Sequence, residues 1–328
     1  MKFKYHTIHD KFPTESKWLK ESREYVGHTE FYKNHEEMLK RYAVYGSFPY
    51  KTPSGGQLTF NHWTASNRLR TVSMYREMQV FETVFTDEDH AKRVWLEAAS
   101  LEYVIAKLDY YGISVFLKEV EDGTRKGFYS RTNLRYGMTT IGNMLRCGWL
   151  EEAKDLLEHI HYLIPQNAFT DAGETIAIKE TEKLILELAS ETLGIEAKTI
   201  VRDPIMNDPE IENARAHWLS DDIEIVEQIF TGLLHRHTHL SHPSKKGVEQ
   251  DFDYYFLRYN PYEVVSLMRL RQIHGKPNPV IDHRLMRPIT GELLEGTRPA
   301  LAEFEREVVA RIIEDAQINE PLLDIALG

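Results

Sequence analysis

The sequence predicts an all-α protein, an irregular bundle of antiparallel helical hairpins joined by long loops. Its long apolar patterns repeat at three- and four-residue spacing, which is the period of an α-helix. No pattern alternates strands with helices, and no tight turn joins two alternating apolar runs. Glycine and proline mark the breaks between several of the patterns. We therefore expect more than half of the residues in helices and at most a minor sheet.

The first half of the chain is predicted to hold four helices and one loop. Proline and glycine content indicates the loop. The clearest helix follows Asp87, which can cap it, and carries a broad apolar face. In chain order, the predictions are two helices over 15–45 with a break near Gly27, a loop over 47–56, a helix over 65–85 (with a strand as the alternative) and a core helix over 88–110.

The helix with the clearest start and stop signals in the second half follows Asn260. Asn260 is a good N-cap, Pro261 suits the first helical position and Glu263 stands where a capping-box acid reaches back. Gly275 can take the left-handed turn that ends a helix, and residues 280–290 are expected to form a strap across the surface. The other predictions are a helical hairpin over 130–164 that turns at Gly148, and helices over 172–193, 209–218, 220–240 and 299–316.

The least regular internal stretch, residues 195–210, is the predicted domain boundary. It divides the chain into an N-terminal helical region, 1–200, and a C-terminal helical module, 201–328. The alternative is one continuous domain. A chain of 328 residues is long enough for either arrangement.

Cysteine content and hydropathy indicate a cytoplasmic protein. The single cysteine, Cys147, excludes an intramolecular disulfide and a zinc site built from several cysteines. The first residues do not resemble a signal peptide, and no run approaches the roughly 18 apolar residues that span a membrane. We expect no membrane partner.

The two halves of the chain differ in charge. Residues 1–150 hold 22 basic and 18 acidic residues, a balance of +4, whereas residues 151–328 hold 18 and 33, a balance of −15. The acidic half would repel phosphates, which disfavours binding to nucleic acid. It could attract a basic protein partner instead. The alternative is that acidic helices serve only to keep the protein soluble.

Four histidines in the segment LLHRHTHLSHP are the strongest metal-binding signal. On a helix, His237 falls on the buried face, whereas His235, His239 and His242 share another face at spacings that can hold a metal ion. The glutamate of a helical zinc hydrolase is missing. We therefore expect no metal, and partly exposed histidines at a helix end.

No catalytic motif is present in the sequence. It has no G-x-S-x-G, no P-loop and no G-x-G-x-x-G. Acidic runs at 180–182 and 303–307 are interpreted as solvated helix faces, because hydrated carboxylates rarely acquire the shifted pKa that catalysis needs. We expect no enzymatic activity, no catalytic residues and no cofactor.

A family resemblance is carried by residues 221–242 and 252–288. An acid-capped helix that ends in histidine is followed by an aromatic and acidic run, the helix PYEVVSLMRLRQIHG and the segment NPVIDHRLM. This order resembles the C-terminal part of helical immunity proteins, which protect bacteria from their own polymorphic or secreted toxins. The resemblance implies a non-enzymatic protein that binds a cognate toxin, such as a nuclease, and blocks its active site.

Six acids are the predicted toxin-binding residues: Asp221, Asp222, Glu224, Glu249, Asp251 and Asp253. The first three are expected to be exposed at the start of a helix. The last three could instead cap or orient the element that follows them, which would be a structural role. Two other functions remain open: a helical scaffold or regulator that uses the hairpin at 130–164, and a histidine-dependent metal hydrolase at 235–242.

Overall fold

The computed structural model describes residues 1–52, 55–124, 132–169, 179–196, 208–242, 250–287 and 289–318. Helices hold 68% of these residues, and the sheet found among them has two strands, which confirms the all-α prediction. No helix in these ranges is both long enough and apolar enough to cross a membrane.

The chain divides into two compact units, and each is discontinuous in sequence. Unit 1 comprises Met1–Trp18, Val84–Glu88 and Arg131–Thr297, and unit 2 comprises Leu19–Thr83, Asp89–Ser130 and Arg298–Gly328. The predicted boundary at 195–210 does not coincide with this division, since the chain on both sides of it belongs to unit 1. Residues 197–207 lie outside the described part of the chain.

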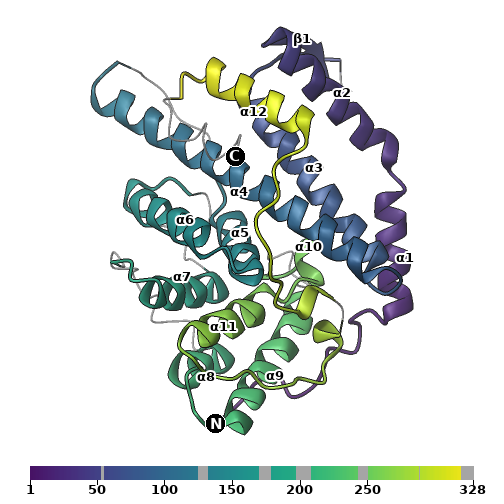
Figure 1. Cartoon of the computed structure of the whole chain (residues 1–328), viewed down its shortest axis with the longest axis vertical. Helices are drawn as coiled ribbons and strands as arrows, with labels where there is room; N and C mark the ends of the chain where they lie inside the picture. Colours follow the sequence, from purple (N-terminus) through teal and green to yellow (C-terminus); the bar gives the residue numbers. More distant parts are fainter. Residues whose placement is uncertain are drawn as a thin grey trace. The chain divides into compact units, whose positions relative to one another are not determined.

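Unit 1 is a set of helices packed around α11 (Figure 1). Helix α11, Tyr262–Ile273, contacts α5, α7 and α9. The neighbouring pairs α5–α6 and α8–α9 also pack directly on each other. Gly148 makes the predicted turn between α5 and α6, with a φ of 74°. The other bounds are Leu134–Cys147 for α5, Leu150–Leu163 for α6, Glu180–Thr192 for α7, Pro209–His217 for α8, Ile223–Leu240 for α9 and Tyr255–Arg258 for α10, with 3-10 turns at Ile164–Gln166, Arg284–Met286 and Ile289–Gly291.

Burial on all sides explains the composition of α11. Val264, Val265 and Leu267 point in different directions around the helix, and all are fully buried. Neighbours therefore surround the helix as far as Arg271, so apolar residues occur on every side, and its last two residues, Gln272 and Ile273, are exposed. Gly142 on α5 permits the close approach, because a Cβ there would lie 2.8 Å from the Tyr262 ring.

The start of α11 differs from the prediction, although its end agrees. The N-cap is Pro261 and not Asn260. The Asn260 side chain accepts a hydrogen bond from Arg146 Nη2 at 2.8 Å, because this buried guanidinium needs acceptors. Glu263 is likewise engaged elsewhere, with His237. Gly275 ends the helix with a φ of 68°, as predicted.

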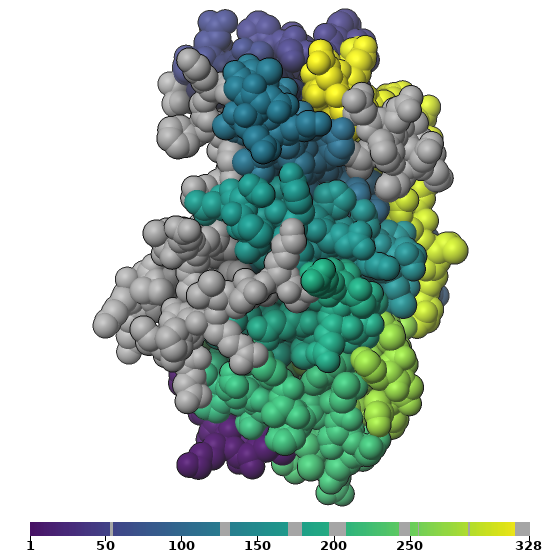
Figure 2. All heavy atoms as spheres, turned by 90° about the vertical axis from the view of Figure 1, so that its left-hand side faces the viewer, coloured from purple at the N-terminus to yellow at the C-terminus, as the bar shows by residue number. Residues whose placement is uncertain are grey.

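The N-terminal segment, residues 1–13, lies along α8 and α9. Figure 2 shows it in purple against the green atoms of this region. The backbone N–H groups of Lys4 and Tyr5 donate to Glu210 Oε1 at 2.5 and 2.7 Å, and His9 N–H donates to Thr238 Oγ1 at 2.9 Å. Side chains of the two helices therefore accept hydrogen bonds from backbone N–H groups of a segment that has no secondary structure of its own.

Unit 2 is built from long helices and one short hairpin. Helix α2 (Thr29–Tyr45) packs on α3 (His62–Thr83) and on α12 (Glu303–Asp315), and α12 also packs on α3. The two remaining helices, α1 (Glu15–Val26) and α4 (Glu88–Glu121), have their first residues in unit 1. Helix α4 continues through Gly112 and is longer than predicted. The helix prediction for 65–85 is confirmed, and the strand alternative is wrong.

The loop predicted over 47–56 contains the first strand of the hairpin. Strands β1, Phe48–Lys51, and β2, Gln57–Phe60, pair antiparallel with Phe48 opposite Phe60. Their rings stack with centroids 5.0 Å apart. Four-residue strands are too short to show an alternating pattern, so the hairpin could not be recognised from the sequence.

We expect the substitution Gly142→Ala to lower the free energy of unfolding by about 1–3 kcal/mol. Alanine favours a helix over glycine by about 1 kcal/mol, so a net loss would show that the added methyl group forces α5 and α11 apart. Urea unfolding measures the change. The control is Glu158→Ala on the exposed side of α6, which should stay within about 0.5 kcal/mol of wild type. A stabilised Gly142→Ala variant would contradict this account.

Candidate functional site

Four exposed acids gather where α8 turns into α9. We call Asp221, Asp222, Glu224 and Glu227 the acidic corner; all four are exposed, as predicted for the first three. Asp222 caps α9, since its Oδ1 accepts hydrogen bonds from the N–H groups of Glu224 and Ile225 at 3.0 and 3.4 Å. Glu224 and Glu227 form no ion pair with any residue that the structure describes. They are charges available to a partner.

Arg271 holds the acidic corner in place. Its buried guanidinium donates to the carbonyl oxygens of Trp218 and Ser220, which directly precede the corner, and of Pro277 in the segment after α11. Burial lowers its pKa. Lys276 in the same segment pairs with Asp221, whose pKa this hydrogen bond lowers. The segment after α11 therefore lies beside the corner, as the ribbon also shows (Figure 1).

Exposed apolar side chains accompany these charges. Ile223 follows the cap of α9, Ile273 ends α11 and Val280 lies four residues beyond Lys276. They are 37%, 38% and 94% exposed. Ile223 lies between Asp222 and Glu224 in the chain, and the Lys276–Asp221 pair joins the corner to the segment between Ile273 and Val280.

Two of the other predicted toxin-binding acids, Asp251 and Asp253, form contacts within the protein. Asp251 accepts from Arg236 Nη2 at 2.7 Å, and Asp253 accepts from Gln250 N–H at 2.8 Å and lies 3.7 Å from Arg135 Nη1. Burial would raise the pKa of Asp251, but Arg236 outweighs it and the pKa is lowered. These contacts support the structural alternative for both residues. Glu249 lies outside the described residues.

The acidic runs interpreted as solvated faces are partly internal. Glu180, Glu182 and Glu305 are buried, and only neighbours such as Glu303 are exposed. Glu182 lies 3.4 Å from Arg135 Nε, and Glu305 pairs with Arg76. Burial raises the pKa of Glu180 and of Glu305. The interpretation was wrong for these three acids. Glu182 and Glu305 have arginine partners that are far away in sequence, whereas Glu180 lies 3.9 Å from Lys183 on the same helix.

The histidines of α9 separate into different environments. His237 is buried, as predicted, and its ring nitrogens face Glu263 Oε1 at 2.7 Å and the Leu257 and Arg258 carbonyls. His239 and His242 lie near the His9 ring, with centroids 4.8 and 5.3 Å from it, whereas His235 lies 5.5 Å from the His283 ring. Among the described residues, no group of three or more acids, histidines or cysteines has a geometry that could hold a metal ion.

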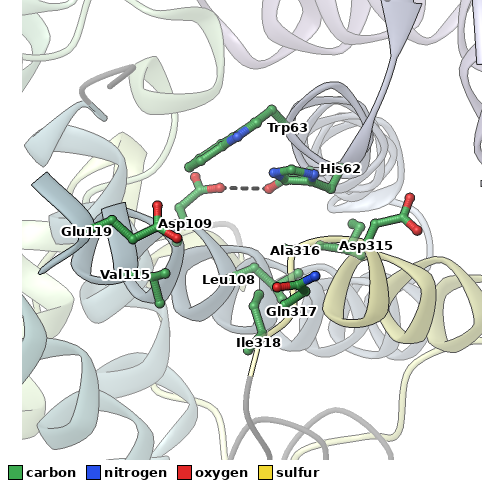
Figure 3. Close-up of a pocket in the computed structure, with 13 residues that line it drawn as sticks. His62, Trp63, Leu108, Asp109, Val115, Glu119, Asp315, Ala316, Gln317 and Ile318 are labelled. Carbon is green, nitrogen blue, oxygen red and sulfur yellow. Dashed lines mark hydrogen bonds between the residues drawn. The ribbon is translucent and has the colours of Figure 1, made fainter. Parts of the chain in front are cut away.

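Sequence reasoning missed a pocket in unit 2, which we call the Trp63 pocket (Figure 3). It is a cavity of about 170 Å³ between α3, α4 and the end of α12. Its wall combines the Trp63 indole, the carboxylates of Asp109, Glu119 and Asp315, and the apolar side chains of Leu108, Val115, Ile312 and Ile318. No sequence motif links these positions, since three separate helices contribute them.

Hydrogen bonds and an ion pair with neighbouring side chains fix two of the pocket carboxylates. Asp109 accepts from Ser66 Oγ at 2.7 Å and pairs with Arg70. Asp315 Oδ2 accepts from the hydroxyl of Tyr42 at 2.7 Å. Burial raises the pKa of Tyr42, and the Asp315 carboxylate raises it further. The hydroxyl therefore remains a donor, and both acids have fixed positions.

Comparisons with known proteins identify no relative. No family model, no curated protein and no solved structure matches the chain. Geometry, charge and the resemblance of the C-terminal segments are what bear on function.

We expect Asp251→Ala to destabilise the protein by about 3–5 kcal/mol, because it leaves the buried Arg236 with one fewer carboxylate. Asp221→Ala should have a much smaller effect, since its ion pair with Lys276 lies at the surface. Urea unfolding of both variants tests the two roles. Equal effects would contradict the division between structural and surface acids.

Acid should destabilise the protein partly through His283. Burial, reinforced by His235 and other nearby positive groups, lowers its pKa to about 3, so the folded state keeps the ring neutral. The unfolded chain takes up this proton near pH 6.5. The contribution of His283 to the free energy of unfolding is therefore fully present above pH 6.5. It decreases by about 1.4 kcal/mol per pH unit as the pH falls toward 3.

The variant His283→Asn tests this contribution. Asparagine can still accept from Leu285 N–H, as His283 Nδ1 does at 3.2 Å, but it does not titrate. We expect urea unfolding between pH 6.5 and 5 to show a smaller pH dependence than in wild type, by about 2 kcal/mol over this interval. The exposed His274→Asn is the control. An unchanged pH dependence in His283→Asn would show that this ring is not kept neutral.

Proposed function

We propose that this chain is a non-catalytic binding protein that neutralises a cognate bacterial toxin, acting as an immunity protein. The observation that carries the proposal is the acidic corner, where Glu224 and Glu227 are exposed with no ion-pair partner among the described residues. The toxin is the partner implied by the resemblance of residues 221–242 and 252–288 to immunity proteins. A nuclease would be a suitable target, because the groove that holds its phosphates is basic.

Charge supports a basic partner. The acidic corner belongs to the part of the chain whose balance is −15, and opposite charge steers association and speeds it. Fast capture matters when the target acts catalytically. The Arg271 contacts also hold the corner rigid before binding, which reduces the entropy lost on association.

The exposed apolar groups give the surface a means to hold its partner. Interfaces commonly bury an apolar centre inside a polar rim, and the centre contributes most of the affinity. Ile223, Ile273 and Val280 provide such groups beside the acids. We infer that the charges chiefly set the association rate and that the apolar groups chiefly slow dissociation.

A helical scaffold that binds another partner through the α5–α6 hairpin is the second candidate. The observation in its favour is Tyr162 on α6, which is 46% exposed. Every position of α5 except Tyr136 is buried, so α6 would supply most of this surface.

Charge reversal distinguishes the two surfaces. An immunity gene lies beside the gene of its toxin, so the test measures association rates with the product of the neighbouring gene, at several salt concentrations. Glu224→Lys/Glu227→Lys should slow association by about tenfold or more at low salt and flatten its salt dependence. The control, Glu151→Lys/Glu158→Lys, makes the same charge change on exposed positions of α6 and should leave the rate near wild type.

Each result has a distinct meaning. A larger effect from the α6 reversal would favour the scaffold, and indifference to both reversals and to salt would make the acidic corner a solubility feature. Val280→Ser should raise the dissociation rate while the melting temperature stays near that of wild type, since this side chain has few contacts to lose. If the neighbouring product does not bind at all, the immunity proposal is wrong.

A further inference from the structure

We propose that the Trp63 pocket binds an organic cation that has an apolar stem, such as an alkylammonium or alkylguanidinium group. The pocket lies within unit 2, and the proposal is independent of the acidic corner. Its volume of about 170 Å³ suits a group of this size. An apolar cavity of about 150 Å³ in another protein holds a benzene molecule.

The charge of the wall selects a cation. Figure 3 shows Glu119 and Asp315 on opposite sides of the pocket, with Asp109 and the Trp63 ring between them. The 13 residues that line the pocket include these three acids and no lysine or arginine. Arg70 compensates Asp109 from outside the lining, but Asp315 has no ion pair with any residue that the structure describes, so the wall is negative beside it. An anion would be repelled, and a neutral ligand would bury the Asp315 carboxylate without a compensating charge.

The Trp63 indole offers the second contact that a cation favours. A cation over an aromatic face is attracted by the ring quadrupole, most strongly for tryptophan. Gly112 on α4 allows the ring to lie close, because a Cβ there would be 3.1 Å from Trp63 Cη2. Leu108, Val115 and Ile312 supply apolar surface for the stem.

Asp315 is the carboxylate best placed to bind the cationic group. Its Oδ2 accepts the hydrogen bond of Tyr42, which fixes the side chain. Its Oδ1 has no hydrogen bond with any described residue and remains available as an acceptor. Asp109 uses one oxygen for Ser66 and the other for Arg70, so we assign it a supporting electrostatic role.

Calorimetric titration with a matched pair of probes tests the charge requirement on the full chain. Butylguanidinium and butylurea have nearly the same shape, but only the first is charged. We expect saturable binding of one butylguanidinium per chain and at least tenfold weaker binding of butylurea. Equal affinity for the two probes, or no binding of either butylguanidinium or the arginine peptide described below, would overturn the proposal.

Two variants locate the binding in the pocket. Asp315→Asn retains an acceptor for Tyr42 and removes the charge, so it should weaken butylguanidinium binding by about ten- to a hundredfold without unfolding unit 2. Trp63→Leu should weaken it by about two- to thirtyfold. Glu307→Gln removes one charge from an exposed position of the same helix, α12, and should have no effect. Binding that Asp315→Asn leaves unchanged, or that Glu307→Gln reduces as much, would place the cation elsewhere.

A second arm identifies the source of the cation. Agmatine represents a free amine metabolite, and the peptide Gly-Gly-Arg-Gly-Gly represents an arginine side chain of a protein partner. Tighter binding of agmatine assigns the pocket to a small molecule, and tighter binding of the peptide assigns it to a protein. Either result must show the same loss in Asp315→Asn.

Discussion

Arg236 lies on α9 with its guanidinium buried, and three other segments of unit 1 meet at it. Its nitrogens donate to Asp208 ahead of α8 at 2.6 Å, to Thr181 on α7 at 2.7 Å and to Asp251 ahead of α10 at 2.7 Å. Burial would lower the pKa of Arg236, but the two carboxylates raise it, so the charge is retained. Because an uncompensated buried charge costs several kcal/mol, these segments cannot separate independently. The positions of α7, α8 and α9 follow from this requirement.

Other arginines of unit 1 use backbone carbonyl oxygens in the same way. Arg269 donates to the carbonyls of Leu145, Arg146 and Leu294. Arg271 donates to those of Trp218 and Ser220, just before the acidic corner. A guanidinium has five donors in a fixed plane, so each one can hold several irregular segments together. Loops of unit 1 thereby gain a defined shape without secondary structure. This would suit the binding role that we propose, which requires a surface of fixed shape.

The sequence predicted what depends on local pattern. Periodicity located the helices, and glycine located the turns at Gly148 and Gly275. Predictions that depended on distant partners were less successful: Asn260 was expected to cap a helix and instead binds Arg146, and the sequence left toxin binding and a structural role both open for Asp251, which binds Arg236. The exposure of Asp221, Asp222 and Glu224 was predicted correctly because a helix start next to a polar turn is usually exposed. The Trp63 pocket could not be predicted, since it exists only where α3, α4 and α12 meet.

Because both units are discontinuous in sequence, neither can fold completely until its last segment has been synthesised on the ribosome. The first 18 residues belong to unit 1, but most of that unit, Arg131–Thr297, is synthesised after much of unit 2 has emerged. Unit 2 in turn lacks α12 until residues 303–315 have been synthesised, after the whole of unit 1. When the first segment of either unit leaves the ribosome, the segments that pack on it have not yet been synthesised. The apolar surface that these later segments will cover therefore stays exposed to solvent until they emerge. Such chains depend on chaperones more than chains whose domains fold one after another.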